Sequence, residues 1–387
     1  MGAIKIKGYR RSEKLFGIRN HVVVFSGVTC ANSIVEQITR ADAHIIPITH
    51  QHGCTHVGAD KEQVLRTLSG ICSNPNVGGV LLVGLGCETI GVDDIASGIA
   101  PDGRLVKTLV IQQIGQLQKI MDAARESLRQ LKNFVSSQKC TEFDISHLTV
   151  GLECGGSDPF CGITANPAVG LVSDRLVELG ATVILSEIPE MIGAENALSS
   201  RLPDDNVKQK LFSRIKEYVE SAKGMGCDLR GANPTPGNIR AGISSIEEKS
   251  LGCIIKAGTS NINEFVGYAE RPGCRGLVVM DTPGNDAESV TGLAAGGANL
   301  VLFTTGTGTP LGNPVVPVIK IASNTKTYEY MKDFIDIDAG KVIQGTPADV
   351  VADEIFKFVV DVCNGKRTAA EINNCREFAV NRVGPSF

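Results

Sequence analysis

The sequence predicts an α/β fold with two α/β domains, mainly parallel sheets and a site between the domains at the carboxyl ends of the strands. Short apolar runs, such as His21 to Ser26 and Gly79 to Gly84, alternate with helical patterns, which is typical of βαβ units with parallel strands. Glycine accounts for 43 of 387 residues and clusters between these runs, as ligand-facing loops require. We expect domains at residues 1–140 and 147–387, joined by a polar linker at Ser136 to Ser146.

The bulk composition favours a small-molecule partner. The formal net charge is −4 and the sequence pI is about 5.9, so we expect no nucleic-acid partner. No apolar run approaches the roughly 20 residues of a membrane span, and Met1 to Arg11 lacks the apolar core of a signal peptide. We therefore expect a cytoplasmic protein without a membrane partner, whose 12 cysteines are thiols and not disulfides.

Three cysteines of the first half each follow a predicted strand: Cys30, Cys54 and Cys87. Because parallel strands end at the same edge of a sheet, their thiols should meet there, and such thiols suit iron or an iron–sulfur cluster. Three buried structural cysteines are the alternative. Three of the six histidines also fall between Thr49 and His56, a density that favours metal or acid–base chemistry.

The second half contains a loop rich in glycine and small polar residues, Cys154 to Gly170. Such a loop can bring backbone donors and hydroxyls to a small polyol, or it can simply be a tight connection with a buried cysteine. Glu187 and Glu190 follow a later strand as candidate bases or metal ligands, with solvated loop acids as the alternative. The tail from Ala348 to Phe387 has a helical pattern.

Taken together, these motifs resemble the altronate/galactarate dehydratase family over nearly the whole chain. The family carries a Cys in the first βα loop, a His-x-Tyr-Gly-Cys element, Gly-Leu-Gly-Cys-Glu, a Cys-Gly-Gly-Ser-Asp loop, Asn-Pro-x-Pro-Gly-Asn and Phe-Thr-Thr-Gly-x-Gly. The corresponding segments here are Cys30, His50 to Cys54, Gly84 to Glu88, Cys154 to Pro167, Asn233 to Asn238 and Phe303 to Gly308.

This resemblance implies a hydro-lyase that depends on Fe²⁺ or Mn²⁺, with an iron–sulfur cluster as a further option, and that converts a sugar acid to a 2-keto-3-deoxy acid. It also implies a small β-rich domain that is fused ahead of this region in many relatives. We therefore expect a small companion subunit and a homo-oligomer. The related sulfolactate sulfo-lyase beta subunit, which releases sulfite, lacks counterparts of Cys30, Cys54 and Cys87, so the sequence agrees with the dehydratases.

Two departures from the family pattern affect substrate binding. His52 stands where relatives usually have Tyr, and Thr307 replaces an Arg often found in the Thr-Thr-Gly loop. Because Arg can bind a carboxylate through two hydrogen bonds, its loss is expected to change which acid is bound.

We assign site roles on this basis. His50 is the first choice for acid–base duty, with Glu190 as the alternative. The metal or cluster ligands are Cys30, Cys54 and Cys87, with Cys154 as a possible fourth, whereas Cys161 lies outside the family's fixed positions. The residues expected to hold substrate hydroxyls and carboxylate are Arg19, Ser157, Asp158, Asn166, Asn238, Thr305 and Lys320. The non-enzymatic alternative is a sugar-acid-binding subunit whose partner carries catalysis.

Overall fold

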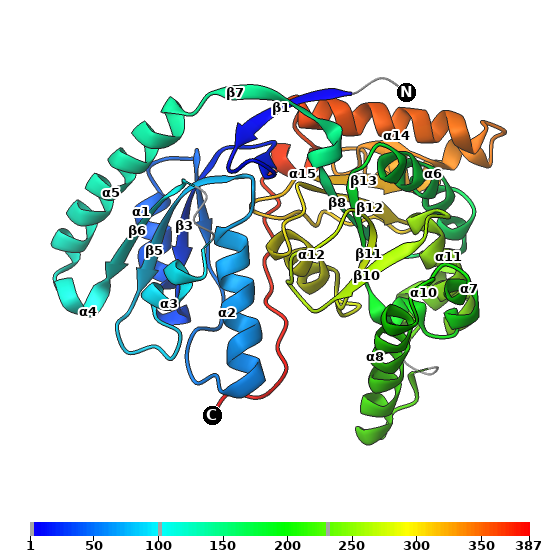
Figure 1. The fold of residues 1–387 in the computed structure, drawn as a ribbon, viewed down its shortest axis with the longest axis horizontal. Coiled ribbons are helices and arrows are strands. Elements are labelled where there is room, and N and C mark those ends of the chain that lie inside the picture. Colours follow the sequence, from blue (N-terminus) through cyan, green and yellow to red (C-terminus); the bar gives the residue numbers. More distant parts are fainter. Residues whose placement is uncertain (1–3, 100–102, 230–232) are drawn as a thin grey trace.

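A computed structural model describes residues 4–99, 103–229 and 233–387 and confirms the α/β class (Figure 1). Two sheets are entirely parallel. The first has the order β4-β3-β5-β6, with β3 (His21–Ser26), β4 (Ile45–Ile48), β5 (Val77–Gly84) and β6 (Leu105–Val110). The second has the order β10-β11-β9-β8-β12-β13-β14, with β8 (Thr149–Cys154), β9 (Thr182–Leu185), β10 (Ile262–Val266), β11 (Gly276–Met280), β12 (Leu300–Thr305), β13 (Val318–Ala322) and β14 (Ile337–Asp338).

Helices cover both faces of each parallel sheet. Those of the first half are α1 (Asn32–Thr39), α2 (Gly58–Cys72), α3 (Val92–Ser97), α4 (Ile111–Ile114) and α5 (Leu117–Ser137). Those of the second half are α6 (Ala165–Glu178), α7 (Glu195–Ser199), α8 (Asp205–Gly224), α10 (Pro236–Ala241), α11 (Ile246–Ile254), α12 (Asp286–Ala295), α13 (Thr325–Tyr330), α14 (Ala348–Cys363) and α15 (Ala369–Ile372). Short 3-10 helices are η1 (Thr29–Ala31), η2 (Ile145–His147), η3 (Pro159–Gly162), η4 (Ile188–Met191), η5 (Ile255–Ala257) and η6 (Gly340–Val342).

The pleat of β3 shows how the layers form. Val22 and Val24 belong to the core shared with α1 and α5, whereas Val23 and Phe25 point to the core shared with α2, because successive side chains of a strand face opposite ways. That second core also takes in α12 and strands of the larger sheet. The α2 and α12 helices thus form a layer between the two sheets (Figure 1).

The α2 and α12 helices run in the same direction. A Cβ added to Gly70, near the end of α2, would lie 2.7 Å from the carbonyl oxygen of Ala295, the last residue of α12. Nearer the beginnings of the helices, Asn381 connects Gln63 of α2 to Glu288 of α12 through hydrogen bonds of 2.9 and 2.8 Å. Since each helix follows a strand and runs back across its sheet, the carboxyl ends of both sheets open on the same side of the molecule.

Two expectations about connecting segments are only partly right: α14 and α15 lie in the tail expected to be helical, and residues 136–146 do lead from α5 toward β8. The segment expected as a linker contains the end of α5 and β7 (Cys140–Asp144), which pairs antiparallel with β1 (Lys5–Arg10); β1 also pairs with β2 (Phe16–Gly17). The last residues, 373–387, form no helix but run as an irregular segment between the two halves (Figure 1). In both cases the partners are far apart in sequence, so local patterns did not reveal them. The domain boundary itself stays a prediction.

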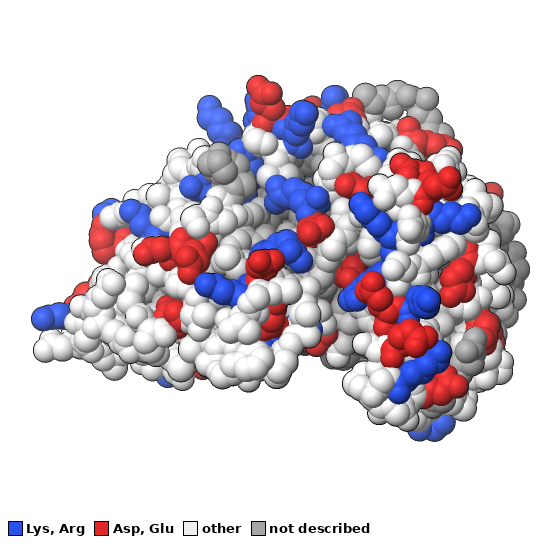
Figure 2. Space-filling model, turned by 60° about the horizontal axis from the view of Figure 1, so that its bottom comes forward, with Lys and Arg blue, Asp and Glu red and all other residues white. Residues whose placement is uncertain are grey.

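No helix within the described ranges is long and apolar enough to cross a membrane. Figure 2 shows the side where α2 begins and the chain ends, and acidic and basic side chains are interspersed over this face.

Candidate active site

The loop that follows β8 forms one wall of a cavity of about 250 Å³. Asp158 begins η3 by accepting a hydrogen bond from the Cys161 N–H at 2.9 Å, and the loop then enters α6. The opposite wall comes from α11 and the residues around it. The residues that line the cavity with polar or sulfur atoms are Cys154, Ser157, Asp158, Cys161, Asn166, Glu248, Lys249 and Cys253.

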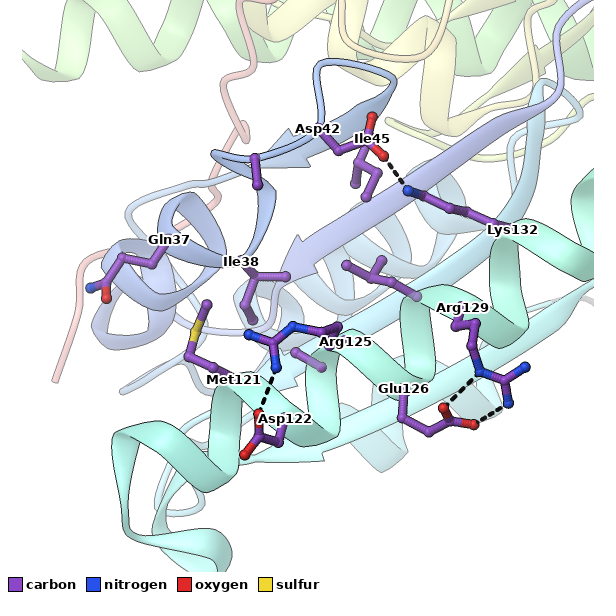
Figure 3. Close-up of a pocket in the computed structure, with 13 residues that line it drawn as sticks. Gln37, Ile38, Asp42, Ile45, Met121, Asp122, Arg125, Glu126, Arg129 and Lys132 are labelled. Carbon is purple, nitrogen blue, oxygen red and sulfur yellow. Dashed lines mark hydrogen bonds and ion pairs between the residues drawn. The ribbon is translucent and has the colours of Figure 1, made fainter.

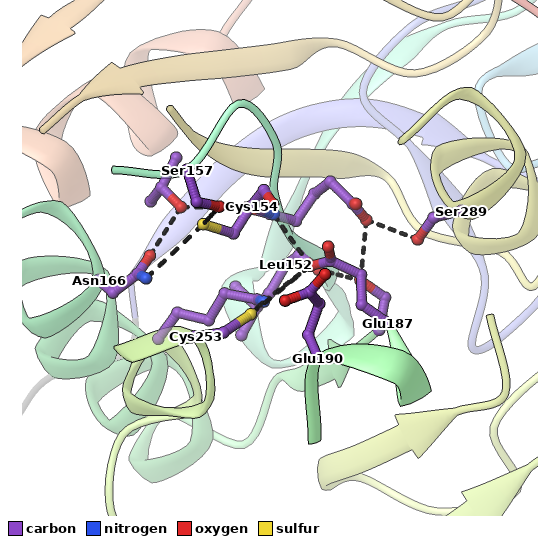
Figure 4. Close-up of polar contacts among 12 residues, drawn as sticks. Leu152, Cys154, Ser157, Asn166, Glu187, Glu190, Cys253 and Ser289 are labelled. Atoms are coloured by element: carbon purple, nitrogen blue, oxygen red, sulfur yellow. Dashed lines mark hydrogen bonds and ion pairs between the residues drawn. The ribbon is translucent and has the colours of Figure 1, made fainter. Parts of the chain in front are cut away.

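Cys154 is the last residue of β8, and its thiol is surrounded by donors (Figure 4). The Ser157 hydroxyl lies 3.1 Å from its sulfur, and the Asn166 amide donates to it at 3.7 Å. Hydrogen bonds from the Cys161 and Cys253 thiols hold the pKa of Cys154 well below its ordinary value, although burial opposes this. A thiolate at Cys154 can therefore exist at neutral pH. Cys161, which the sequence pattern set aside, is part of this buried cysteine cluster.

Lys256, in η5, supplies a buried positive charge behind these thiols. Its ammonium donates to Glu187 at 2.8 Å and to the Cys253 sulfur at 2.7 Å, and it has no exposed surface. Although burial opposes its charge, Cys253 and Glu187 raise the pKa of Lys256 well above its ordinary value. The backbone of Glu187 has a φ of 70°. This conformation is unfavourable for a non-glycine residue, and the surrounding structure must enforce it.

Three acids behind the cavity form a compact group. Glu153, Glu187 and Asp286 each offer a carboxylate oxygen, and these oxygens all lie within 4.8 Å of one another. Burial raises the pKa of Glu187 to about 7 and that of Asp286 to about 6, and it raises that of Glu153 well above its usual range. We call Glu153, Glu187 and Asp286 the acidic triad.

The acidic triad has carboxylate oxygens that suit a divalent cation. One oxygen of Glu153 accepts from Ser186 at 2.8 Å and Ser289 at 2.6 Å, while its other oxygen, Oε1, is buried without a hydrogen-bond partner. A buried carboxylate oxygen without a partner is costly unless a cation or proton compensates it. Oxygen ligands favour Mg²⁺, Mn²⁺ or Ca²⁺, and ferrous iron also accepts them. The acidic triad could thus hold a metal ion.

Strand order explains why the sequence revealed only part of this group. Glu153 is the last residue but one of β8, Glu187 follows β9, and Asp286 begins α12 after β11. In the sheet these strands are neighbours, in the order β11-β9-β8, so their carboxyl ends bring the acids together. Glu187 was already a candidate ligand from its position after a strand. For Glu153, the sequence signal is an acidic residue near the end of an apolar strand, in the segment Leu-Glu-Cys.

Glu190, the alternative base, lies next to the acidic triad on η4. Its Oε1 forms an ion pair of 2.8 Å with Lys249, a residue that lines the cavity. Its Oε2 is buried without a hydrogen-bond partner. This free oxygen and the adjacent cation are features that a base acting on a carboxylic acid would need.

The predicted substrate-binding residues of the second half gather around this loop, where their polar groups mostly hold protein atoms. Asp158 accepts from Ser323 at 2.7 Å and Asn324 at 3.0 Å. Asn238 donates to the Ser157 carbonyl at 2.9 Å, and the Thr305 hydroxyl accepts from the Gly308 N–H at 3.0 Å.

Asn166 accepts from the Thr304 hydroxyl at 2.6 Å and donates to the Gly252 carbonyl at 2.8 Å. Together with Ser157 and Asp158 it lines the cavity. The direct role of these residues toward substrate stays a prediction.

Both ring nitrogens of His50, the first-choice base, are engaged. Nδ1 accepts from the His52 N–H at 3.1 Å, so Nε2 carries the proton and donates to the Ser26 carbonyl at 2.6 Å. Burial lowers the pKa of His50 to about 4. His50 is thus a neutral histidine without a free lone pair, and it would have to release a hydrogen bond before it could act as a base.

Cys30, Cys54 and Cys87 follow β3, β4 and β5, which are neighbours in the first sheet. Cys30 and Cys87 are exposed and Cys54 is half-buried, so they are not buried structural cysteines. Among the described residues, the acidic triad is the group whose ligand atoms lie within 4.8 Å of one another, and the three thiols form no such group. They are therefore not arranged around a single ion. A cluster spaces its cysteines more widely, so an iron–sulfur cluster stays a prediction.

Arg19 and Lys320 lie away from the cavity. Arg19 binds both carboxylate oxygens of Glu371, at 2.7 and 2.9 Å. The Lys320 ammonium donates to the carbonyls of Pro310 at 3.1 Å and Leu311 at 2.9 Å. Both side chains hold distant segments together, and we leave them out of the site proposed below.

Comparisons with known proteins match almost the whole chain. Residues 145–386 match the family model described as D-galactarate/Altronate dehydratase, C-terminal. Residues 8–135 match the model described as D-galactarate dehydratase/Altronate hydrolase, second domain.

Curated relatives agree with these models. Altronate dehydratase of Escherichia coli (strain K12) is 36% identical over 98% of this chain and 78% of its own length. Galactarate dehydratase (L-threo-forming) of the same organism is 34% identical over 93% of this chain and 73% of its own. The (2R)-sulfolactate sulfo-lyase subunit beta of Chromohalobacter salexigens is also 34% identical, over 97% of both chains.

Proposed function

The chain belongs to the altronate/galactarate dehydratase family, whose members include hydro-lyases, and we propose that it removes water from a sugar acid to leave a 2-keto-3-deoxy acid. The observation that carries this proposal is the juxtaposition of Lys249, Glu190 and the acidic triad beside a cavity of about 250 Å³. A cation for the carboxylate, a base with a free oxygen and a group of metal-ligating acids are the components that such an elimination requires.

We assign the substrate carboxylate to Lys249. Its ammonium now pairs with Glu190 at 2.8 Å, so a carboxylate bound to Lys249 would place its α carbon near that acid. Glu190 then removes the α proton through its unpartnered Oε2. The hydroxyl on the β carbon takes up the proton that Glu190 removed and leaves as water, and the resulting enol tautomerises to the 2-keto product.

The acidic triad would hold a divalent cation, Fe²⁺ or Mn²⁺. When bound, this ion would supply Lewis-acid stabilisation of negative charge on substrate oxygens. Lys256 limits the electrostatic cost of the group, because its buried ammonium contacts Glu187. Ser157 and Asn166 line the cavity next to Cys154 and would contact the remaining hydroxyls. His50, Cys30, Cys54 and Cys87 follow strands whose carboxyl ends open on the same side of the molecule as this site. They stay candidates for a catalytic or metal-binding role in it.

A substrate screen tests this proposal. Purified chain, prepared without oxygen and supplied with Fe²⁺ or Mn²⁺, is incubated with altronate, galactarate and related aldonates, alone and with proteins that copurify with it. We expect a 2-keto-3-deoxy product from at least one sugar acid, and at least a 100-fold lower rate for Glu190→Gln. Glu354→Gln, at an exposed surface pair, is the matched control. A complete lack of turnover with every sugar acid would overturn the proposal.

A second candidate function is elimination of sulfite from sulfolactate. The sulfo-lyase subunit beta is about as similar to this chain as the galactarate dehydratase, at 34% identity. Because that relative is one subunit of its enzyme, it also supports a companion subunit for this chain. Adding sulfolactate to the screen and measuring released sulfite separates the two reactions. Sulfite release without turnover of sugar acids would favour this second function.

A further inference from the structure

Further cavities of the described residues lie outside the candidate active site. A groove of about 640 Å³ runs between α1 and α5 (Figure 3). Its charged side chains are paired: Arg125 with Asp122 and Arg129 with Glu126, both at 2.6 Å, and Lys132 with Asp42. Such neutralised pairs describe a solvated surface, and they give no reason to expect a charged ligand there.

A smaller cavity, of about 170 Å³, lies where the two halves meet. His21 is the first residue of β3, and His44 directly precedes β4. Asn313 precedes β13, while Arg367 and Arg376 flank α15. The cavity therefore lies at the amino ends of the strands, on the side opposite to the candidate active site. We call it the junction pocket, defined by His21, His44, Asn313, Arg367 and Arg376.

The junction pocket has a surplus of positive charge. Arg367 donates to the Glu371 carbonyl, and Arg376 donates to the Asn374 side chain at 3.2 Å, and both of these acceptors are neutral. Glu371 is the acid that lines the pocket, and Arg19 holds both of its oxygens. The carboxylate at the pocket is thus already neutralised, while two guanidinium groups are not.

The pKa values of the lining groups reflect this surplus. Burial lowers the pKa of Arg376, and the neighbouring Arg367 lowers it further. Burial lowers the pKa of His21 to about 4; Glu371 opposes this shift, while Arg19 and Arg376 add to it. Burial is the larger cause of both shifts, and the smaller contribution of the neighbouring guanidinium groups is the part that favours a bound anion.

Asn313 contributes an unused donor. Its Oδ1 accepts from the N–H groups of Val315 at 3.0 Å and Val316 at 3.3 Å, which fixes the orientation of the amide. Its Nδ2 is buried and has no hydrogen-bond partner. Leaving such a donor unpaired is unfavourable, and an anion oxygen in the pocket would satisfy it.

We propose that the junction pocket binds a small dianion, either a phosphate group or a dicarboxylate, between the two arginines and the Asn313 amide. The site is separate from the proposed catalytic cavity, because it lies at the opposite ends of the strands. The pocket also holds the beginning of the irregular terminal segment, since Asn374 lines it. Further along, Phe378 packs against the His50 ring with centroids 6.2 Å apart.

Calorimetric titration at constant ionic strength tests the proposal. The probes are inorganic phosphate and malonate, with chloride as the reference anion. We expect saturable binding of one dianion to the unmodified chain, with affinity at least 10-fold lower in Arg376→Met. Asn313→Asp keeps the acceptor for Val315 and Val316 but replaces the donor by a negative oxygen, and it should weaken binding similarly. Which probe binds more tightly distinguishes a phosphate ligand from a dicarboxylate.

Two controls keep the result specific. Arg129→Met removes an exposed arginine that forms an ion pair with Glu126, and it should bind like the unmodified chain. Lys249→Met removes the cation of the catalytic cavity and should also leave binding unchanged. Thermal melting confirms that each variant is folded. The proposal is overturned if neither dianion binds more tightly than chloride, or if Lys249→Met abolishes binding while Arg376→Met retains it.

Discussion

Lys256 and Glu187 form an ion pair of 2.8 Å in which at most 1% of either side chain is exposed. Removing one partner of such a pair leaves an uncompensated buried charge, so Lys256→Met should destabilise the protein by about 3–5 kcal/mol. Urea unfolding measures this. Lys341→Met, which breaks an exposed pair with Glu354, should change stability by less than about 1 kcal/mol.

The double variant Lys256→Met/Glu187→Gln tests the same pair where the single variant folds poorly. Because it removes both charges together, it should recover part of the lost stability. A double variant that is less stable than Lys256→Met would contradict the buried ion pair as the cause.

Cys154 should react with small thiol reagents at a pH where ordinary cysteines are inert. The thiolate is the nucleophile, and the Cys161 and Cys253 thiols hold the pKa of Cys154 below its usual value. Cys274 is the reference, because it is an exposed residue. Partial burial of its sulfur raises the pKa of Cys274 to about 11. Mass spectrometry after brief treatment with methyl methanethiosulfonate near neutral pH should find Cys154 modified before Cys274. The reverse order would show that Cys154 carries no thiolate.

The acidic triad predicts how stability depends on pH without metal. The pKa values of Glu187, about 7, and Asp286, about 6, lie above their ordinary values of 4.5 and 3.8. A folded state with raised carboxyl pKa values binds more protons than the unfolded state, so these groups make stability fall as the pH rises from about 4 to 7. A melting series over this range should show that decline, and Asp286→Asn should reduce it.

Metal binding should reverse that dependence, because a cation favours the ionised carboxylates. Mn²⁺ should raise the melting temperature more at about pH 7.5 than at about pH 5.5, where protons compete for the same oxygens. Glu153→Gln should weaken this response, whereas Asp353→Asn, at an exposed surface pair, should not. An equal Mn²⁺ response in Glu153→Gln and the unmodified chain would argue against the acidic triad as the metal site.

Asp60 should hold the end of the chain against the His50 loop. Its carboxylate accepts from Arg382 and His56, at 2.8 and 2.7 Å, and from the N–H groups of Val383 and Gly384. Although burial opposes ionisation, these bonds hold the pKa of Asp60 well below its usual value. The contribution of Asp60 to the stability of the fold is thus complete above a pH of about 4. It is lost as the pH falls toward the pKa of Asp60 in the folded state.

Asp60→Asn tests this contribution. We expect a loss of about 2–3 kcal/mol near neutral pH, because several hydrogen bonds to a charged group are weakened. Hydrogen exchange should speed up in residues 380–387. Asp333→Asn is a control, since Asp333 is exposed and its backbone carbonyl, which the substitution keeps, accepts from Asn373. Unchanged exchange in the terminal residues of Asp60→Asn would contradict this role.

Much of the architecture follows from local sequence patterns. Apolar runs of strand length alternate with helical patterns, and the runs His21 to Ser26 and Gly79 to Gly84 correspond to β3 and to most of β5. The same patterns indicated that the Cys154 loop and Glu190 lie at strand ends, where α/β proteins place their sites. These features depend on the periodicity and chemistry of neighbouring residues, which the sequence displays directly.

The tertiary structure alone decided which side chains meet. The order β11-β9-β8 brings Glu153 and Asp286 to Glu187, although more than 130 positions separate the first two in the chain. The fold also pairs Arg19 with Glu371, and it places both ring nitrogens of His50 in hydrogen bonds. Strand order and side-chain pairing depend on packing between distant segments, and local periodicity carries no record of them. The sequence thus determined the types of groups at the strand ends, whereas the fold decided which of them remain free to act.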